Sequence, residues 1–196
     1  MDKYIRLLVI PALALGFLNL ARATVETYVI DSVHSSVGFT IRHMVSKVPG
    51  NFTQFSGQIM LDREDFEKSS VEASVELSSV DTRNEKRNGH LQSPDFFDVA
   101  KYTTATFKSK TWQKTGEDKY AVTGDLNLHG VTKEVLLEVT LLGFGSGMKP
   151  NSRLSGWEAT TKINKSDFGI SGPAILGTVL GDEVTINITI EAGMKP

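Results

Sequence analysis

The sequence contains no cysteine, few aromatic residues and no large excess of charge of either sign. Of its 196 residues, none is Cys, 8% are aromatic, and the formal net charge is −2. Without cysteine, the chain has no disulfides, thiol catalysis, iron–sulfur clusters or thiolate zinc sites. The balanced charge also argues against a surface that binds polyanions. We therefore expect no nucleic-acid partner.

Long apolar runs are also scarce, with one exception at the N-terminus. Lys3 and Arg6 precede an apolar run from Leu7 to Leu20, and small residues follow at Ala21 and Ala23. This order is typical of a secretory signal peptide, here residues 1–23 with cleavage after Ala23. An uncleaved anchor is the alternative, although the run is shorter than the ~20 residues of a membrane-spanning helix. Residues 24–196 are then expected to form a single exported domain.

Apolar and polar residues alternate over most of that domain. Such a period of two is typical of strands with one buried face. By this criterion eight strands are expected, at about residues 37–41, 55–61, 71–77, 106–112, 122–128, 135–141, 154–163 and 184–191. Most connections are short enough for antiparallel hairpins, and no alternation of strands with helices is present. The residues therefore indicate an all-β sandwich or an up-and-down barrel.

Two connections are too long for hairpins. In the first, between the third and fourth expected strands, Thr82 and Glu85 fit a capping box, which predicts a short helix from Arg83 to about Leu91. Ser93 and Pro94 then predict a second short turn. The second connection, residues 164–181, is more apolar than a solvated loop. It forms either one wall of a cavity mouth or a simple cover over one end of the fold.

Five motifs in register resemble the YceI-like family and span essentially the whole domain. They include Ile30-Asp31-x-x-His34-Ser35, Gln54-Phe55-Ser56-Gly57, Ser79-Val80-Asp81-Thr82, Gly124-Asp125-Leu126-x-Leu128-His129-Gly130 and Asp167-Phe168-Gly169-Ile170. Two positions depart from the family pattern, because Asn88 stands where aspartate is usual and Lys165 where arginine is usual. The resemblance implies an eight-stranded antiparallel lipocalin-like barrel in the periplasm, often dimeric. It also implies a polyisoprenoid ligand, such as an isoprenoid quinone or a polyprenyl phosphate.

The alternating rows supply candidates for the wall of an apolar ligand site. An eight-stranded barrel is either filled by its own side chains or holds one small ligand, so each candidate is either ligand wall or ordinary core. The candidates on the wall are Phe39, Ile41, Phe55, Phe107, Leu126, Leu128, Val135, Leu137, Trp157, Ile186 and Ile188. At the mouth we expect Phe97, Phe168 and Ile170.

A basic stripe is expected on the predicted helix. Arg83, Lys86, Arg87 and His90 follow the spacing of one helix face. This stripe is either a solvated face or a contact for an anionic lipid, through a phosphate head group or a membrane surface.

The four histidines carry the competing function. His34, His43, His90 and His129 have no spacing of a known metal motif, and Asp31, His34 and Ser35 contain the residue types of a catalytic triad without its elbow motif. We expect Asp31 and His34 to be hydrogen-bonded structural groups. The favoured function is therefore a non-enzymatic lipid carrier without a cofactor or metal. A histidine-dependent metal-binding protein or stress-related enzyme, and a pure adhesion module, are the alternatives.

Overall fold

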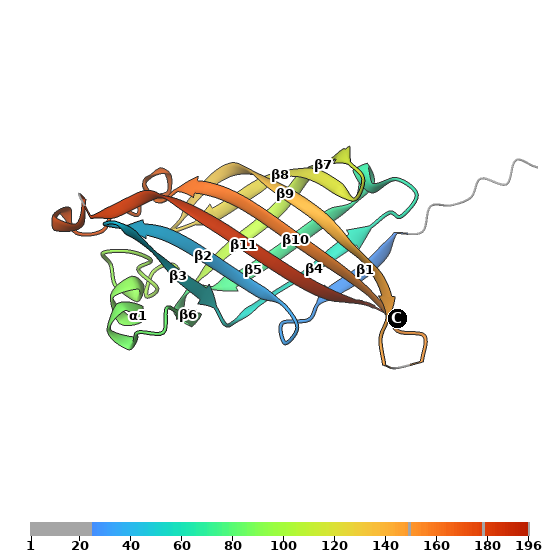
Figure 1. Ribbon diagram of the computed structural model, residues 1–196, viewed down its shortest axis with the longest axis horizontal. Helices are drawn as coiled ribbons and strands as arrows, with labels where there is room; N and C mark the ends of the chain where they lie inside the picture. The colour runs from blue at the N-terminus through green and yellow to red at the C-terminus, as the bar shows by residue number, and fades with distance from the viewer. Residues whose placement is uncertain (1–24, 149, 178, 196) are drawn as a thin grey trace, which may run out of the picture.

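The computed structural model describes residues 25–148, 150–177 and 179–195, and the expected signal peptide lies outside them. The strands follow one another along the chain with one helix among them (Figure 1). The strands are β1 (Glu26–Ile30), β2 (Ser36–His43), β3 (Ser46–Phe52), β4 (Phe55–Leu61), β5 (Ser70–Glu76), β6 (Val80–Asp81), β7 (Thr104–Gly116), β8 (Lys119–Leu128), β9 (Val131–Ser146), β10 (Arg153–Asn164) and β11 (Leu180–Met194). The helix α1 spans Glu85–Gln92, and short 3-10 turns lie at η1 (Phe66–Lys68), η2 (Leu77–Ser79), η3 (Lys165–Phe168) and η4 (Ala174–Leu176).

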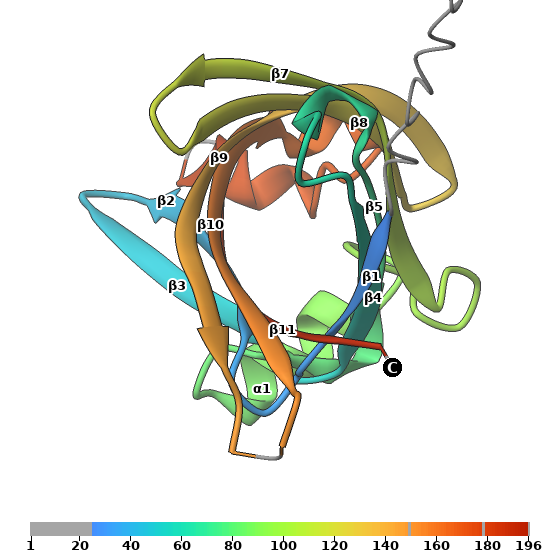
Figure 2. The same cartoon turned by 90° about the vertical axis from the view of Figure 1, so that its right-hand side faces the viewer.

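Eight of these strands close into an antiparallel barrel. The order is β1-β4-β5-β7-β8-β9-β10-β11, and pairing of β1 with β11 completes the ring. Figure 2 shows this ring along the barrel axis. The barrel expected from the sequence is thus confirmed, with α1 between its third and fourth ring strands. No helix in the described ranges is long and apolar enough to cross a membrane.

The hairpin of β2 and β3 widens one end of the barrel. β11 pairs with β1 near its C-terminal end and with β2 over its earlier residues, where Ile186 faces Phe39. β2 continues to β3, and β3 pairs with β6 at Asn51 and Phe52. Three of these strands, β1, β3 and β6, were not expected from the alternating pattern. The ring therefore uses β1 where the sequence suggested β2.

The helix begins later than the sequence predicted. The side chain of Asn84 accepts a hydrogen bond from the Arg87 amide at 3.0 Å, so Asn84 is the N-cap. The expected capping box of Thr82 and Glu85 is wrong, because the Thr82 side chain is buried and its hydroxyl donates to Asn88 Oδ1 at 2.6 Å. Arg83 lies before the helix, with a positive φ of 60°.

Two clusters of buried side chains divide the interior. One is centred on Tyr28, Leu61 and Ala192, each with no exposed surface, and fills the end of the barrel near the C-terminus. The Tyr28 hydroxyl donates to Glu26 at 2.8 Å, and its burial and this bond raise the pKa of Tyr28 to about 12. The other cluster, around Leu77 and Phe168, lies at the end that carries α1 and η3.

Candidate functional site

A cavity of about 450 Å³ runs through the barrel between these two clusters. This volume lies within the ~300–1,000 Å³ that small-molecule sites occupy. Aliphatic and aromatic side chains of the ring strands form most of its wall, and the hairpin of β2 and β3 contributes Phe39, Ile41 and Val48. The wall is apolar because the inward-facing positions of each strand carry the apolar half of the alternation.

Two tryptophans of the first cluster line the cavity. The rings of Trp112 and Trp157 meet edge to face, with centroids 5.7 Å apart and planes at 87°. The Trp157 indole nitrogen donates to the Ser155 hydroxyl at 3.0 Å, and that of Trp112 donates to the Ser109 hydroxyl at 3.4 Å. Their polar N–H groups are therefore satisfied within the wall, and the rings offer apolar surface to the cavity.

Close packing of backbone on side chain determines where the aromatic rings of the wall lie. Gly124 on β8 leaves room for Phe107, because a Cβ there would lie 2.5 Å from the Phe107 ring. On the other side of the barrel, the Phe39 ring lies against Gly50 of β3 and is tilted against Phe52 at 5.6 Å. Rings held in this way line the cavity without filling it.

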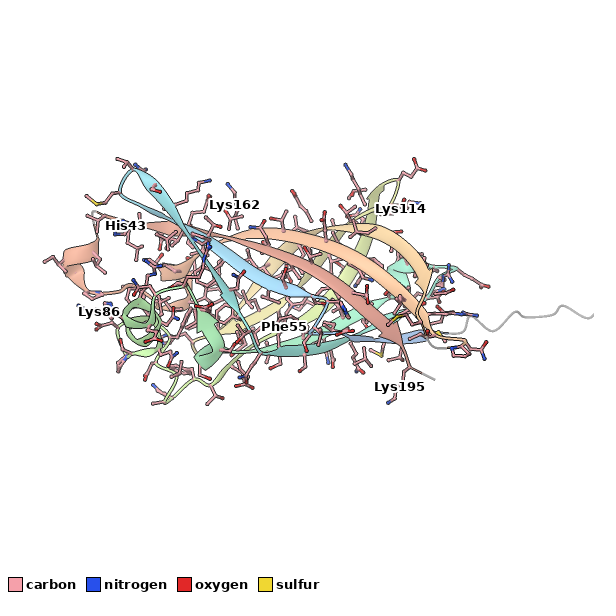
Figure 3. All side chains as sticks on the ribbon, turned by 60° about the horizontal axis from the view of Figure 1, so that its bottom comes forward. His43, Phe55, Lys86, Lys114, Lys162 and Lys195 are labelled. Carbon is pink, nitrogen blue, oxygen red and sulfur yellow. The ribbon has the colours of Figure 1, made fainter. Side chains whose placement is uncertain are left out.

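Cationic and polar side chains are concentrated at the other end of the cavity. Arg87, His90, His43 and Lys165 all line the cavity there. In Figure 3, His43 and Lys86 lie at this end, whereas Lys114 and Lys195 lie at the opposite end. A ligand with an apolar tail and a polar head would therefore place its head here.

The first connection holds Arg87 in place. Arg87 donates from Nε to the Thr82 hydroxyl and from its guanidinium to the Thr82 carbonyl, both at 2.8 Å. Asn88 accepts from the Thr82 amide at 2.8 Å and donates to Asp81 at 3.2 Å. Asn88 thus joins α1, which carries Arg87, to the residues that precede the helix. The guanidinium keeps further donors for a ligand.

Of the two alternatives for the second connection, the structure supports the first, because part of this connection lines the mouth of the cavity. Ile170 and Leu176 line the cavity beside Lys165. The Lys165 side chain is only 13% exposed and donates to Asp182 and to the Ser171 carbonyl, both at 3.3 Å. Asp182 also accepts from the Ser166 hydroxyl at 2.6 Å, and this bond and Lys165 lower the pKa of Asp182.

The structure brings together most of the residues predicted for the ligand wall. Thirteen of the fourteen line the cavity, namely Phe39, Ile41, Phe55, Phe97, Phe107, Leu126, Leu128, Val135, Leu137, Trp157, Ile170, Ile186 and Ile188. Phe168 does not. It is 1% exposed and packs in the cluster around Leu77.

The predicted basic stripe divides into two pairs. Arg87 and His90 line the cavity, and His90 also contacts Asp95 at 2.9 Å. Arg83 and Lys86 are exposed and lie outside the lining. The prediction that all four side chains share one face of the helix is wrong, because Arg83 precedes the helix. Sequence reasoning missed His43 and Lys165 as cavity residues. The available signals were the position of His43 at the end of a strand and the departure of Lys165 from the family pattern.

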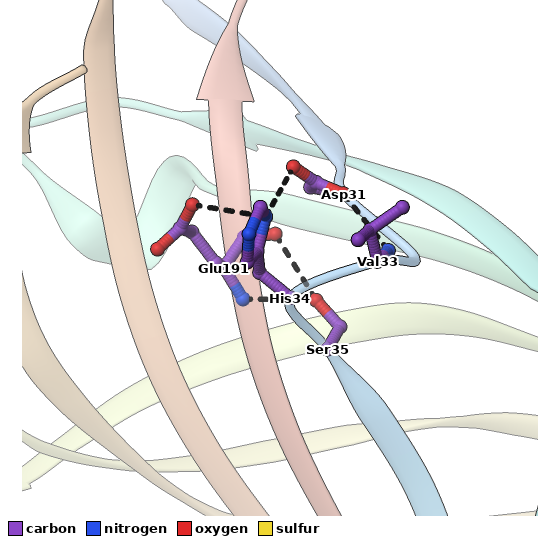
Figure 4. A network of polar contacts seen from close by, with 5 residues as sticks. All are labelled: Asp31, Val33, His34, Ser35 and Glu191. Carbon is purple, nitrogen blue, oxygen red and sulfur yellow. Dashed lines mark hydrogen bonds and ion pairs between the residues drawn. The ribbon is translucent and has the colours of Figure 1, made fainter. Parts of the chain in front are cut away.

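His34 forms part of a polar network on a different part of the surface (Figure 4). His34 Nδ1 lies 2.9 Å from Asp31 and 3.8 Å from Glu191, and the Ser35 hydroxyl bonds to the backbone of Glu191. Hydrogen bonding to Asp31 raises the pKa of His34, and the same bond lowers the pKa of Asp31. Asp31 and His34 are hydrogen-bonded to each other, as expected, and the network joins the connection of β1 and β2 to β11.

The four histidines do not form one cluster, because His43 and His90 line the mouth of the cavity, whereas His34 and His129 lie outside its lining. Among the described residues, the cluster that could ligate a metal, Asp31 with His34 and Glu191, contains a single histidine. His129 lies against the Tyr102 ring, with centroids 4.4 Å apart, and its Nδ1 donates to the Phe168 carbonyl at 3.2 Å. The arrangement therefore provides no support for the alternative that uses the histidines jointly.

An antiparallel barrel with an apolar cavity, closed at one end and edged with cations at the other, defines a class of small-molecule-binding proteins. The YceI-like domain model matches residues 28–192, and the chain belongs to that family. A UPF0312 protein of Azotobacter vinelandii is 38% identical over 188 residues, which cover 92% of this chain and 94% of that protein.

Solved structures show the same barrel. The crystal structure of Burkholderia cenocepacia BcnA superposes with a TM-score of 0.76 at 25% identity and covers 83% of this chain and 98% of that one. A polyisoprenoid-binding domain from Saccharophagus degradans superposes with a TM-score of 0.65 at 19% identity, over 86% of this chain and 98% of that domain. At this identity, the second likeness supports the fold alone.

Proposed function

We propose that the protein is a non-enzymatic carrier of an isoprenoid lipid, an isoprenoid quinone or a polyprenyl phosphate, in the periplasm. The observation that carries this proposal is the apolar cavity of about 450 Å³ with cations at one end. Membership of the YceI-like family supports it, and a domain described as polyisoprenoid-binding has the same barrel fold. The apolar N-terminal run of the sequence supports export.

The physical chemistry of the cavity suits reversible carriage. Each buried methylene contributes about 0.8 kcal/mol relative to water, so a five-carbon isoprene unit gains roughly 4 kcal/mol. A bilayer interior is about as apolar as the cavity, so the net preference for the protein is small. A carrier that must release its cargo requires such a balance. In this proposal Arg87, His90 and Lys165 contact the head group at the mouth.

Filling the cavity tests the proposal. Ala159 on β10 lines the cavity, whereas its neighbour Glu158 is exposed. Native mass spectrometry and lipid extraction are applied to protein purified from the periplasm without detergent. Wild type and Glu158→Trp should carry a stoichiometric isoprenoid, and Ala159→Trp should carry none. Ala105→Phe, on β7 and also on the wall, serves if Ala159→Trp does not fold. Wild-type protein that neither contains nor takes up an isoprenoid would refute the carrier function.

The family resemblance also leads us to propose a homodimer. Light scattering at tens of micromolar protein should then give about twice the mass of one chain. A mass of one chain at that concentration would contradict the dimer without affecting the proposed ligand.

A further inference from the structure

An apolar rim lies beside the cationic end of the cavity. The turn between β2 and β3 consists of Met44 and Val45, which are 57% and 100% exposed. Ile175 in η4 is 84% exposed. The Met44 amide donates to the Val179 carbonyl at 2.6 Å, and the Val179 amide donates to the Leu176 carbonyl. Backbone hydrogen bonds therefore join the two segments, and we call Met44, Val45 and Ile175 the apolar rim.

The rim is continuous with the mouth of the cavity. His43 lines the cavity and directly precedes Met44, and Leu176 lines it next to Ile175. Leu180, a third lining residue, pairs with His43. In Figure 1, the β2–β3 turn and the η4 segment project together from the end of the barrel that carries α1. A lipid that leaves the cavity at this end would pass the apolar rim first.

The residue types of the turn do not suit its backbone. A two-residue hairpin turn favours glycine or asparagine at positions with positive φ. Here Met44 occupies such a position, with a φ of 50°. Turn geometry therefore does not account for the methionine at this place. Local rules of this kind fail most often at functional sites.

Cations without carboxylate partners flank the turn. Arg42 and Lys47 face each other across β2 and β3, and like charges in this arrangement are unfavourable. Arg42 donates to the Met44 carbonyl at 3.0 Å. Across the described ranges neither Arg42 nor Lys47 forms an ion pair, whereas the nearby Asp182 and Glu183 are paired with Lys165 and Lys162. The charge left at the turn is positive.

We propose that the apolar rim inserts into an anionic lipid bilayer and docks the mouth of the barrel on it. Met44, Val45 and Ile175 would enter the boundary between head groups and acyl chains, while Arg42 and Lys47 contact the anionic head groups. Lys86 on α1 is exposed and lies at the same end of the barrel (Figure 3), where it adds positive charge. The inference rests on the proposed carrier function, because docking gives an isoprenoid a path that avoids water.

The chain offers a matched control for the turn. Val33, in the connection of β1 and β2, and Met148, in the connection of β9 and β10, are exposed. Both connections lie away from the end that carries α1 (Figure 1). We compare Met44→Ser/Val45→Ser with Met148→Ser/Val33→Ser, each purified from the periplasm without detergent. The probes are vesicles of phosphatidylglycerol and phosphatidylcholine in equal parts, and vesicles of phosphatidylcholine alone. The readouts are co-sedimentation with vesicles and the rate at which a quinone moves from vesicle to protein.

The rim variant should bind the anionic vesicles roughly tenfold more weakly than wild type, and the control variant should bind as wild type. Arg42→Glu/Lys47→Glu should lose a similar factor at low salt. Met44→Ser/Val45→Ser and Arg42→Glu/Lys47→Glu should both slow quinone transfer from vesicles. Both should take up quinone from a dispersion to the wild-type extent. Equal vesicle binding by wild type and rim variant would overturn the proposal.

Two other outcomes separate the rim from the carrier function. If wild type binds vesicles through the rim but takes up no isoprenoid from a dispersion, the carrier function is wrong and docking stands. If wild type binds no vesicles and Met44→Ser/Val45→Ser instead dissociates a dimer, the rim is a contact between two copies of this chain, and the membrane proposal is wrong.

Discussion

At the scale of single residues, the width of the cavity depends on a position that has no side chain. A Cβ on Gly124 would lie 2.5 Å from the Lys108 carbonyl oxygen, which the ladder of β7 and β8 holds in place. We expect Gly124→Ala to lower the free energy of unfolding by about 1–3 kcal/mol, as overpacking does. Chemical denaturation measures the loss.

The control for this prediction is another strand glycine. A Cβ on Gly145 of β9 would meet no atom within 4 Å, so Gly145→Ala should leave the denaturation midpoint nearly unchanged. Equal midpoints for the two variants would show that β7 and β8 separate easily at Gly124, and would contradict the close packing described above.

Alternation in the sequence identified the residues of the wall but not the existence of a cavity. A buried face looks the same in the sequence whether it meets a ligand or another side chain. The volume depends on how rings such as Phe107 and Phe39 pack, which only coordinates reveal. Phe168 was placed wrongly because the 3-10 turn η3 has neither a strand nor a helix period.

At the scale of elements, the N-cap of α1 stabilises the helix that carries Arg87 and His90 at the mouth of the cavity. Asn84→Ala removes the acceptor for the Arg87 amide and should destabilise the helix by about 1 kcal/mol. Hydrogen exchange of the α1 amides and chemical denaturation measure the effect. Asn84→Ser retains a cap oxygen and should behave as wild type within a few tenths of a kcal/mol. If Thr82 were the N-cap instead, Asn84→Ala would leave the stability of the helix unchanged.

The strands missed from the sequence have identifiable causes. β3 contains Pro49 and Gly50, which count against a strand in any local pattern. Pro49 is tolerated because β3 pairs with β6 only at Asn51 and Phe52, and Pro49 therefore lies on an open edge. β6 has two residues and no measurable period. The helix start was misplaced because Thr82 and Glu85 fit a capping box, while tertiary contacts use the Thr82 hydroxyl.

The polar network of His34 gives the barrel a pH dependence. The raised pKa of His34 means that its charged form contributes stability below its ordinary value of 6.5, and that this contribution is lost as the pH rises through the raised value. The lowered pKa of Asp31 means that its contribution is present above 3.8 and is lost as the pH falls through the lowered value. The network is therefore strongest between these two ordinary values.

Substitution of His34 tests this window. His34→Gln should lower the melting temperature more at pH 5.5 than at pH 8.5, because wild type loses the charged imidazole at the higher pH. Val33→Ser, a change in the same connection at a side chain that does not titrate, should show no such difference between the two pH values. A loss that grows with pH would mean that His34 acts in its neutral form.

At the scale of the whole molecule, part of the barrel interior is a cavity and not packed core. The side chains around the cavity lack packing partners on one side, and the chain has no disulfide to offset this loss. A ligand that fills the cavity restores those contacts in the folded state alone. The proposed function therefore predicts that ligand and stability are linked.

Removal of the lipid should lower the melting temperature, and its return should restore it. At a ligand concentration of about 100 times Kd, binding adds about 2.7 kcal/mol. For a domain of this size, 1 kcal/mol corresponds to roughly 2–4 °C, so the shift should be about 5–11 °C. Glu158→Trp should show the same shift, whereas Ala159→Trp, with its cavity filled, should show none. If delipidated and loaded wild type melted at the same temperature, the bound lipid would lie outside the cavity, because a ligand held by the folded barrel alone must stabilise it.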